Sequence, residues 1–322
     1  GAISNIVNIR TLIPLGISDG VNMSLLSLAL FDLLYLICAL INAICLLLHC
    51  VEELSGYKVL FPVDPEAIYM VIINAGSGFY AISMLVTTFI TVVRCLAVAR
   101  PLQYRSLISW RTTALIISIF TLLSITSAIL MMAFLGILPQ FDSKTNTTRP
   151  TLWLSPQRVV IKDVIFGIRD MILPLTSQII VGICVVIMAR YLREASNFRQ
   201  NIARNIYMET ITSISTRADA LTRNLKTLAS TPASAKVVVK EIQVVQQMLL
   251  IAVVYSLCNM PKVVFNMTQL IVPDFYRGRR YSAVYLTCNF IRELIQSVNA
   301  SVTIFIYWKY NSKFRSHFVR TK

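Results

Sequence analysis

Long apolar runs, separated by shorter polar stretches, dominate the hydrophobic pattern of this chain. Several runs exceed the roughly 18 residues that a helix needs to cross about 30 Å of hydrocarbon. Residues 1–9 are apolar but too short to span, and we interpret them as the inner half of a first helix. The other runs are 21–50, 66–98, 113–137, 160–192, a sixth helix that ends near Ile271, and 282–308. The pattern predicts an all-α membrane protein, one seven-transmembrane helix bundle over residues 1–322 with a truncated first helix.

The polar stretches between the runs are assigned to alternate sides of the membrane. The longest, residues 193–240, is basic and rich in Ser and Thr, which is the composition of a mobile, phosphorylatable loop. Its last part has helical spacing and is expected to extend the sixth helix inward. In the tail, residues 310–322, two phenylalanines lie on one face among basic residues, which predicts a short amphipathic helix on the membrane surface. The remaining stretches are 10–20 and 99–112 inside, and 51–65, 138–159 and 273–281 outside.

The net charge of +15 is distributed unevenly. The chain is 56% hydrophobic and only 14% charged, whereas soluble domains carry about 25% charged residues, so a secreted or cytosolic enzyme is excluded. The segments assigned to the inner side hold 19 Lys and Arg against 5 Asp and Glu, and the outer segments hold 8 against 7. This excess is the positive-inside signal, which predicts that the amino end lies outside and the carboxyl end lies in the cytoplasm. We expect a multi-pass protein of the plasma membrane. The basic inner face suits anionic lipid, and the scarcity of aromatic residues among its basic residues argues against nucleic acid.

Motifs for metal, redox or catalytic chemistry are scarce. Most of the seven cysteines lie within apolar runs, where cysteine behaves as a small hydrophobe, and the outer stretches offer no obvious disulfide pair. His49 and His317, the two histidines, are too few and too far apart in sequence to predict a metal site. No HExxH or GxSxG motif occurs, so we expect neither an enzyme nor a cofactor. Asn146 begins an N-glycosylation sequon in an outer stretch.

Two ionisable residues mark the inner half of the predicted bundle. Asp32 lies near the middle of an apolar run, where a carboxylate is costly and is a functional candidate by default. A satisfied structural polar residue is the alternative. Arg94 ends the apolar run TTFITVVR, and Pro101 then ends the helix or breaks its line. The segment therefore presents one cation at the inner face for a partner to contact, unless Arg94 is only a topogenic charge.

A second group of ionisable residues lies in the outer halves of the last three runs. Its three cations and two anions could simply pair with one another, in a structural role. Alternatively they form a polar ligand pocket, in which a lysine or arginine binds a carboxylate and an acid binds an amine. We assign to this candidate ligand-binding set Tyr80, Arg169, Asp170, Lys262, Arg292 and Glu293.

Short motifs occur along essentially the whole chain. They are Gly1 to Asn5, Leu28 to Asp32 (LALFD), Val93-Arg94-Cys95 with Pro101-Leu102, Pro174, Cys258 to Pro261 (CNMP), and Thr303 to Tyr307 (TIFIY) followed by Phe314. As a set, these motifs resemble those of the rhodopsin-like (class A) G-protein-coupled receptors. Phrases such as VNMSLLSLALFDL and NASVTIFIYWKYNSKFR look most like the invertebrate, especially molluscan, chemosensory and neuropeptide-receptor-like branch.

The resemblance implies a signalling mechanism. An extracellular ligand, either a chemosensory molecule or a neuropeptide, would shift the bundle between two arrangements, with the sixth helix pivoting near Pro261. Arg94 and the inner loops would then engage a heterotrimeric G protein. Asn259 and Tyr307 occupy the family's switch positions, and Glu241 lies where some members carry an acid that holds the arginine at rest. A receptor kinase and arrestin are further partners that the resemblance implies, through the Ser and Thr residues of the third inner loop.

The resemblance also implies an ion site in the middle of the bundle. Oxygen ligands around one carboxylate suit a hard cation such as sodium, and a water-filled hydrogen-bond cluster is the alternative. The four residues at the matching positions are Asp32, Ser83, Asn299 and Thr303.

The sequence departs from the family pattern at several switch positions. Val93 replaces the acid beside the arginine, Asn259 replaces the usual tryptophan, and Ile304 replaces the proline of the last motif. Gly76 stands where amine receptors carry an aspartate, which disfavours a biogenic amine as ligand. A membrane transporter or a ligand-gated seven-helix channel is the alternative reading, although no internal repeat of the kind that transporters contain is visible.

Overall fold

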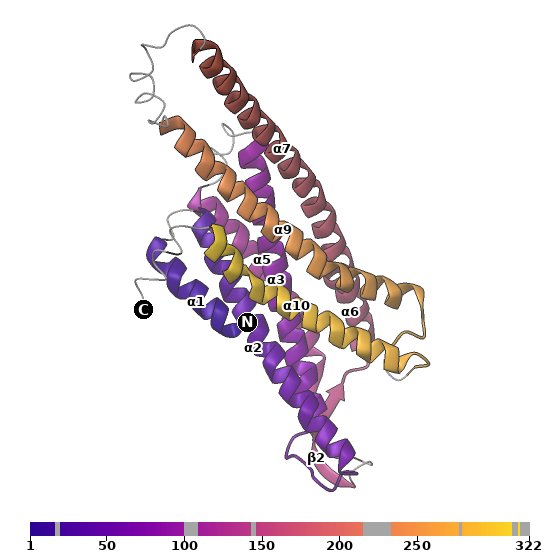
Figure 1. Ribbon diagram of the computed structural model, residues 1–322. Helices are drawn as coiled ribbons and strands as arrows, with labels where there is room; N and C mark the ends of the chain where they lie inside the picture. The colour runs from indigo at the N-terminus through magenta and orange to yellow at the C-terminus, as the bar shows by residue number, and fades with distance from the viewer. Residues whose placement is uncertain are drawn as a thin grey trace.

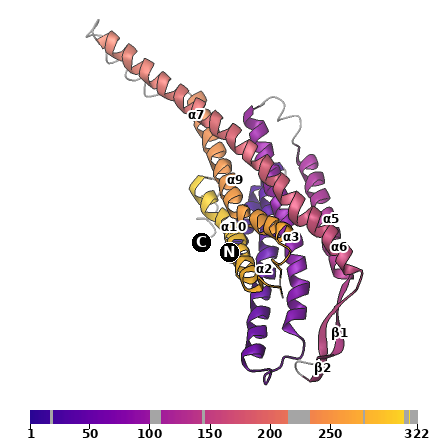
Figure 2. The same ribbon diagram turned by 90° about the vertical axis from the view of Figure 1, so that its right-hand side faces the viewer.

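The architecture is a bundle of long helices, seen in a computed structural model (Figures 1 and 2). The structure describes residues 1–16, 20–99, 109–142, 146–214, 233–276, 279–310 and Arg315, with 198–214 and 233–244 described as backbone alone. Most of the described residues are helical, so the prediction of a helical protein is confirmed. The amino end lies beside the last helix, which brings the two ends of the bundle sequence together (Figure 1).

The helices of the first half follow the predicted apolar runs. Ser109 caps the fourth of them, because its Oγ accepts a hydrogen bond from the backbone N of Thr112 at 3.2 Å. Helix α2 lies along α3 in both views (Figures 1 and 2). The elements are α1 (Ala2–Leu12), the 3₁₀ turn η1 (Ile13–Leu15), α2 (Gly20–Leu54), α3 (Pro65–Ala99) and α5 (Trp110–Ala133).

The second half contains one continuous helix with a π-helical segment, and two further helices. The π-helical segment interrupts the predicted fifth helix in its outer part. Helix α9 contains Pro261 and changes direction along its length (Figure 1), as expected for a proline inside a helix. The elements are α6 (Arg158–Ile165), the π-helix η2 (Phe166–Ile172), α7 (Leu173–Ile214), α9 (Ala233–Ile271) and α10 (Ser282–Tyr310).

Five helical stretches of the described chain are long and apolar enough to cross a membrane. They are Gly20–Leu54, Pro65–Ala99, Trp110–Ala133, Val160–Glu194 and Val245–Ile271. Helix α1 falls short because its 11 residues extend only about 17 Å. Helix α10 is about 44 Å long but carries charged and amide side chains along its outer half. The structure therefore supports a helical membrane protein. Five described helical stretches, rather than the seven predicted, are both long enough and apolar enough to cross a membrane.

Large apolar side chains cover the outside of the bundle. Leu47, Leu122 and Phe305 are 64%, 67% and 71% exposed. Surfaces that are apolar over whole helices are typical of proteins embedded in lipid, since water would make such exposure costly. The polar side chains are instead gathered between the helices.

Polar contacts attach α1 to α10 in the buried interior. Asn5 donates its amide to the backbone O of Ala300 at 2.7 Å, and Asn8 donates to Oγ1 of Thr303 at 3.3 Å. Both asparagines are fully buried, and a buried amide is stable only when it is hydrogen-bonded. These contacts fix the short first helix in place and position Thr303 of the predicted ion site.

The outer stretch 138–159, predicted as a loop, contains a β-hairpin. Strand β1 (Leu135–Asp142) pairs antiparallel with β2 (Thr147–Leu154), so that Pro139 lies opposite Pro150. A two-stranded hairpin has only edge strands, which tolerate proline. The expected extension of the fourth helix to residue 137 is wrong, because that helix ends at Ala133. The sequon residue Asn146 is exposed in the turn at φ 54°, a left-handed conformation that asparagine tolerates.

The inner loop is shorter than predicted. Helix α7 continues to Ile214, so the interpretation of 193–240 as a mobile loop is wrong at its start. Helix α9 begins at Ala233, which confirms the expectation that the last part of this stretch extends the sixth helix. Residues 193–214 contain neither proline nor glycine and are rich in helix-forming residues, which explains the extension. The middle of that loop, and the amphipathic helix predicted over 310–322 apart from Arg315, lie outside the described residues.

Candidate functional site

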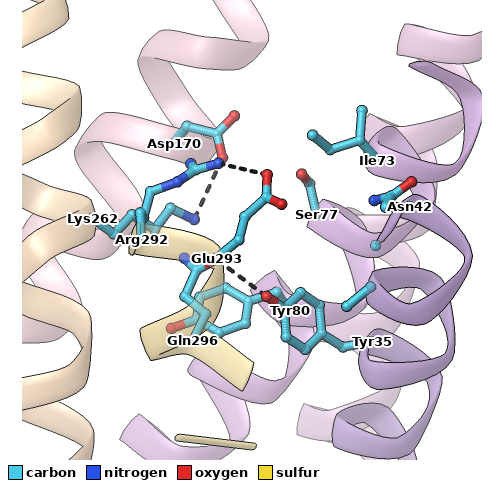
Figure 3. A pocket seen from close by; sticks show the side chains of 12 residues that line it. Tyr35, Asn42, Ile73, Ser77, Tyr80, Asp170, Lys262, Arg292, Glu293 and Gln296 are labelled. Atoms are coloured by element: carbon cyan, nitrogen blue, oxygen red, sulfur yellow. Dashed lines mark hydrogen bonds and ion pairs between the residues drawn. The ribbon is translucent and has the colours of Figure 1, made fainter. Parts of the chain in front are cut away.

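A polar pocket opens between helices in one half of the bundle (Figure 3). It encloses about 430 Å³ of open space, including the solvent at its mouth. Its walls come from α2, α3, η2, α9 and α10, which are far apart in sequence. Five of the six residues predicted to bind ligand line this pocket: Tyr80, Asp170, Lys262, Arg292 and Glu293. Arg169 does not line the pocket, but it forms an ion pair with Asp170, which does.

Asp170 is the electrostatic centre of the pocket. One of its carboxylate oxygens accepts from Arg169 Nη2 at 3.0 Å, and the other lies 3.5 Å from Lys262 Nζ. The Arg169 and Lys262 side chains are only 9% and 4% exposed. Buried charges of this kind are tolerated only when they are paired, so this one carboxylate stabilises two cations from two different helices.

The π-helical segment and the proline that follows it set the position of Asp170. Pro174 has no N–H and cannot donate to the carbonyl four residues earlier, which is that of Asp170. The side-chain amide of Asn266 on α9 donates to this carbonyl instead. The helix is therefore irregular at the residue that carries the buried charge, and π segments often occur at functional sites. The amide also joins the outer parts of η2 and α9.

A second ion pair lies nearer the pocket mouth on α10. Arg292 Nη2 is 3.5 Å from a Glu293 oxygen, and Asn289 bridges the two residues with hydrogen bonds of 2.7 and 3.0 Å. The Arg292 guanidinium also lies over the Phe265 ring, 5.0 Å from its centroid. These side chains are 17% and 27% exposed, so they are more accessible than the Asp170 group.

The structure shows the ion pairs of the first interpretation and an open pocket beside them, and ligand binding in that pocket stays a prediction. The ions pair with one another, as the structural interpretation predicted, and four of them also line an open pocket. The group contains three cations and two anions. Full pairing still leaves one positive charge, which would favour an anionic group on a bound molecule.

A chain of polar contacts continues from the pocket into the bundle along α9. Lys262 Nζ lies over the Tyr80 ring, 5.0 Å from its centroid. The Tyr80 hydroxyl donates to Asn259 Oδ1 at 3.2 Å, and Asn259 Nδ2 donates to the Tyr255 hydroxyl, also at 3.2 Å. All four residues are at most 3% exposed. Asn259 thus bridges α3 to the helix that contains Pro261.

The sequence analysis missed the part of the pocket wall that α2 provides. Tyr35 donates its hydroxyl to Gln296 Oε1 at 3.3 Å, and its ring centroid lies 5.1 Å from that of Tyr80. Asn42 lines the same wall. Tyr35 and Asn42 lie three and ten residues after Asp32, near the same face of α2. This periodicity within an apolar run was the available signal.

The four residues predicted to hold sodium line one small cavity deeper in the bundle. The Ser83 hydroxyl donates to the Asp32 carboxylate, and Thr303 accepts from Asn8. Asp32 and Ser83 are only 2% and 3% exposed. Asn299 contributes to the wall of the same cavity from α10. The arrangement brings oxygen atoms to one carboxylate, which is compatible with either a cation or ordered water, and the sodium site stays a prediction.

The predicted inner switch residues are placed at different depths. Arg94 is half-buried on α3, five residues before the helix ends at Ala99. Tyr307 is 1% exposed in the apolar cluster between α2, α3 and α10. Glu241 lies on α9, but its side chain is outside the described part, so its predicted pairing with Arg94 stays a hypothesis. Pro261 lies within α9, two residues beyond Asn259.

No protein-family model matches the chain, and no curated protein matches it at a significant level.

Proposed function

We propose that this chain is a rhodopsin-like G-protein-coupled receptor of the plasma membrane. In this proposal α1 and α10 serve as the first and seventh spans beside the five apolar helices, with the amino end outside. The observation that carries it is the buried path from Lys262 in the pocket through Tyr80 to Asn259 on α9. A pocket coupled to the helix that carries Pro261 is what a ligand-driven switch requires.

The ligand of this receptor carries an anionic group. The pocket's uneven charge favours a carboxylate at the Lys262 and Arg292 end, and Glu293 at the mouth suits a cationic group on the same molecule. A zwitterionic small molecule or the end of a peptide meets both requirements. Such a ligand shifts the bundle only if it binds one arrangement more tightly than the other. Competition with Asp170 for Lys262 supplies that difference in binding.

Guanine-nucleotide exchange tests the proposed function. Membranes containing the full-length protein are mixed with a panel of heterotrimeric G proteins, with and without pools of peptides and small metabolites. We expect one pool to accelerate exchange on at least one G protein, and we expect this acceleration to be lost in Arg94→Ala at equal surface expression. Ligand-dependent ion current or uptake without nucleotide exchange would instead identify the protein as a channel or transporter.

Glu241→Ala is expected to raise ligand-independent nucleotide exchange. Glu241 lies 20 residues before Pro261, about 30 Å inward along α9, which suits a resting contact with Arg94 at the inner rim. Loss of that contact would favour the open arrangement. Basal exchange is measured at matched expression with Glu194→Ala, an acid on α7, as the control. If Glu241→Ala and Glu194→Ala both show wild-type basal exchange, Arg94 is not restrained by this acid.

A further inference from the structure

A second polar cluster lies at the end of α2 that is remote from the inner loop, beside the β-hairpin (Figures 1 and 2). It combines one histidine and two carboxylates. A ring nitrogen of His49 and one carboxylate oxygen each from Glu52 and Asp64 all lie within 4.8 Å of one another. His49 and Glu52 face each other one turn apart on α2, and Asp64 approaches from the residue that precedes α3.

Two atoms of this cluster are buried and unsatisfied. Among the residues that the structure describes, neither Glu52 Oε2 nor His49 Nδ1 has a hydrogen-bond partner. The Glu52 side chain is fully buried. A buried carboxylate oxygen and a buried imidazole nitrogen without partners are each costly, and both are ligand atoms for a metal ion. The two unpartnered atoms therefore indicate that the cluster can bind a ligand, which a group of acidic side chains alone would not indicate.

Most of the remaining polar atoms of these side chains already form hydrogen bonds or ion pairs within the protein. Glu52 Oε1 accepts from Arg149 Nη1 at 2.6 Å and from the backbone N of Phe61 at 2.9 Å. His49 Nε2 lies 3.5 Å from Glu53. Asp64 Oδ1 accepts from the backbone N of Glu66 at 3.0 Å, which leaves the other oxygen available. A histidine that is oriented by a carboxylate on its second nitrogen is the usual supporting contact of a metal ligand.

We propose that His49, Glu52 and Asp64 form a binding site for a zinc-class divalent cation. One imidazole nitrogen with two carboxylate oxygens is a donor set that zinc accepts, with water in the fourth position, whereas calcium prefers oxygen donors alone. Zinc at about 2.1 Å from each ligand separates tetrahedral donors by about 3.4 Å. The ligand atoms, which now lie within 4.8 Å of one another, therefore approach one another by at most about 1.4 Å when the ion binds.

The charges around the cluster are compatible with a dication. Glu52, Glu53 and Asp64 carry three negative charges, and the Arg149 guanidinium carries one positive charge. Two negative charges remain, and one zinc ion neutralises them. Arg149 contacts Oε1 of Glu52, and Oε2 has no partner among the described residues, so that both cations can bind the same carboxylate.

The bound ion would fix the outer end of the bundle. It links α2 to the start of α3, while Arg149 and the backbone contact between Asp64 N and Pro150 O, at 3.0 Å, link the same residues to β2. Metal sites of this kind lower the mobility of the segments that supply their ligands. The site is separate from the ligand pocket and does not depend on the proposed receptor function.

Zinc titration of the purified full chain in lipid nanodiscs tests this proposal. We expect one zinc ion to bind per chain and the midpoint of thermal unfolding to rise with free zinc, and we expect EDTA to reverse both effects. Calcium at the same concentration should have no effect. His49→Ala and Asp64→Asn should each raise the zinc dissociation constant at least 10-fold. Glu52→Gln is avoided, since it would also break the contact with Arg149.

Two matched variants exclude other ligands. His317→Ala removes the only other histidine of the sequence, and Cys50→Ser removes an exposed thiol next to His49. Both are expected to bind zinc as the wild type does. Cobalt substituted for zinc should give visible absorption bands without the charge-transfer band of a thiolate ligand. Failure of the wild type to bind, unchanged affinity in His49→Ala and Asp64→Asn, or loss of binding in Cys50→Ser would each overturn the site.

Discussion

Asp170→Asn is expected to lower the free energy of unfolding by about 3–5 kcal/mol, the largest loss of any single substitution in the pocket. The aspartate is the counter-ion of both Arg169 and Lys262, whose side chains are almost completely buried. An amide of the same size keeps the packing but leaves two cations without an opposing charge. The cost is therefore electrostatic, and it does not arise from a cavity.

The measurement is the midpoint of thermal unfolding in detergent, together with the fraction of protein that reaches the cell surface. Glu293→Gln is the matched control, because its carboxylate is 27% exposed and opposes a single cation; its loss should be below about 1 kcal/mol. Adding Lys262→Gln to Asp170→Asn should restore part of the stability, since it removes one of the stranded cations. Equal losses in Asp170→Asn and Glu293→Gln would show that Asp170 does not carry the pairing.

The long apolar helices could be predicted because membrane crossing imposes a length and a composition that are visible in the sequence. The run 66–98 became α3, which spans Pro65–Ala99. The hairpin could not be predicted in the same way. Its strands contain Pro139 and Pro150, which weaken any strand signal, and their pairing depends on where α5 ends. The extension of α7 to Ile214 was missed because a polar, Ser- and Thr-rich composition was given more weight than the absence of proline and glycine.

The ionisable residues of the pocket could be identified because charge is rare in apolar helices. Sequence alone left their pairing open, since side chains from η2, α9 and α10 meet only when the helices are packed. The choice of Asp170 as the shared counter-ion depends on the π-helical segment, which has no sequence signal that we could use. Geometry was needed to find that Asn259 contacts Tyr80 on another helix.

The polar face of α2 shows what periodicity alone could have contributed. Five polar residues follow one another along α2 at intervals of three or seven residues: Asp32, Tyr35, Asn42, His49 and Glu52. Each lies near the side of the one before, so together they form a stripe that winds around the helix. Only the first was singled out, because it is charged and lies at mid-membrane. The structure shows that this face lines the inner cavity, then the pocket, and finally the outer cluster. The two histidines gave no metal prediction, and only the structure brings two carboxylates beside His49.

Lys262→Ala is expected to abolish the ligand response while the protein still folds and reaches the surface. Its ammonium is one of two cations that line the pocket, and it is directed at the carboxylate position of the proposed ligand. A charge-assisted contact of about 1.5–3 kcal/mol corresponds to about a 10- to 150-fold loss of affinity. The substitution also removes the contact with the Tyr80 ring, where the path to Asn259 begins, so we expect it to weaken the coupling of the pocket to α9 as well.

Folding should survive this change for the reason that makes Asp170→Asn destabilising. Without Lys262 the carboxylate of Asp170 still accepts two hydrogen bonds from Arg169, at 3.0 and 3.3 Å, so no charge is left unpaired. Dose–response curves for nucleotide exchange are compared at equal surface expression, with Lys162→Ala as the control, since that lysine is 44% exposed on α6 and does not line the pocket. A wild-type dose response in Lys262→Ala would remove this lysine from the ligand site. The opposite result, a lost response with unchanged stability, would separate the two functions of the charged group: Asp170 holds the helices together, and Lys262 recognises the ligand.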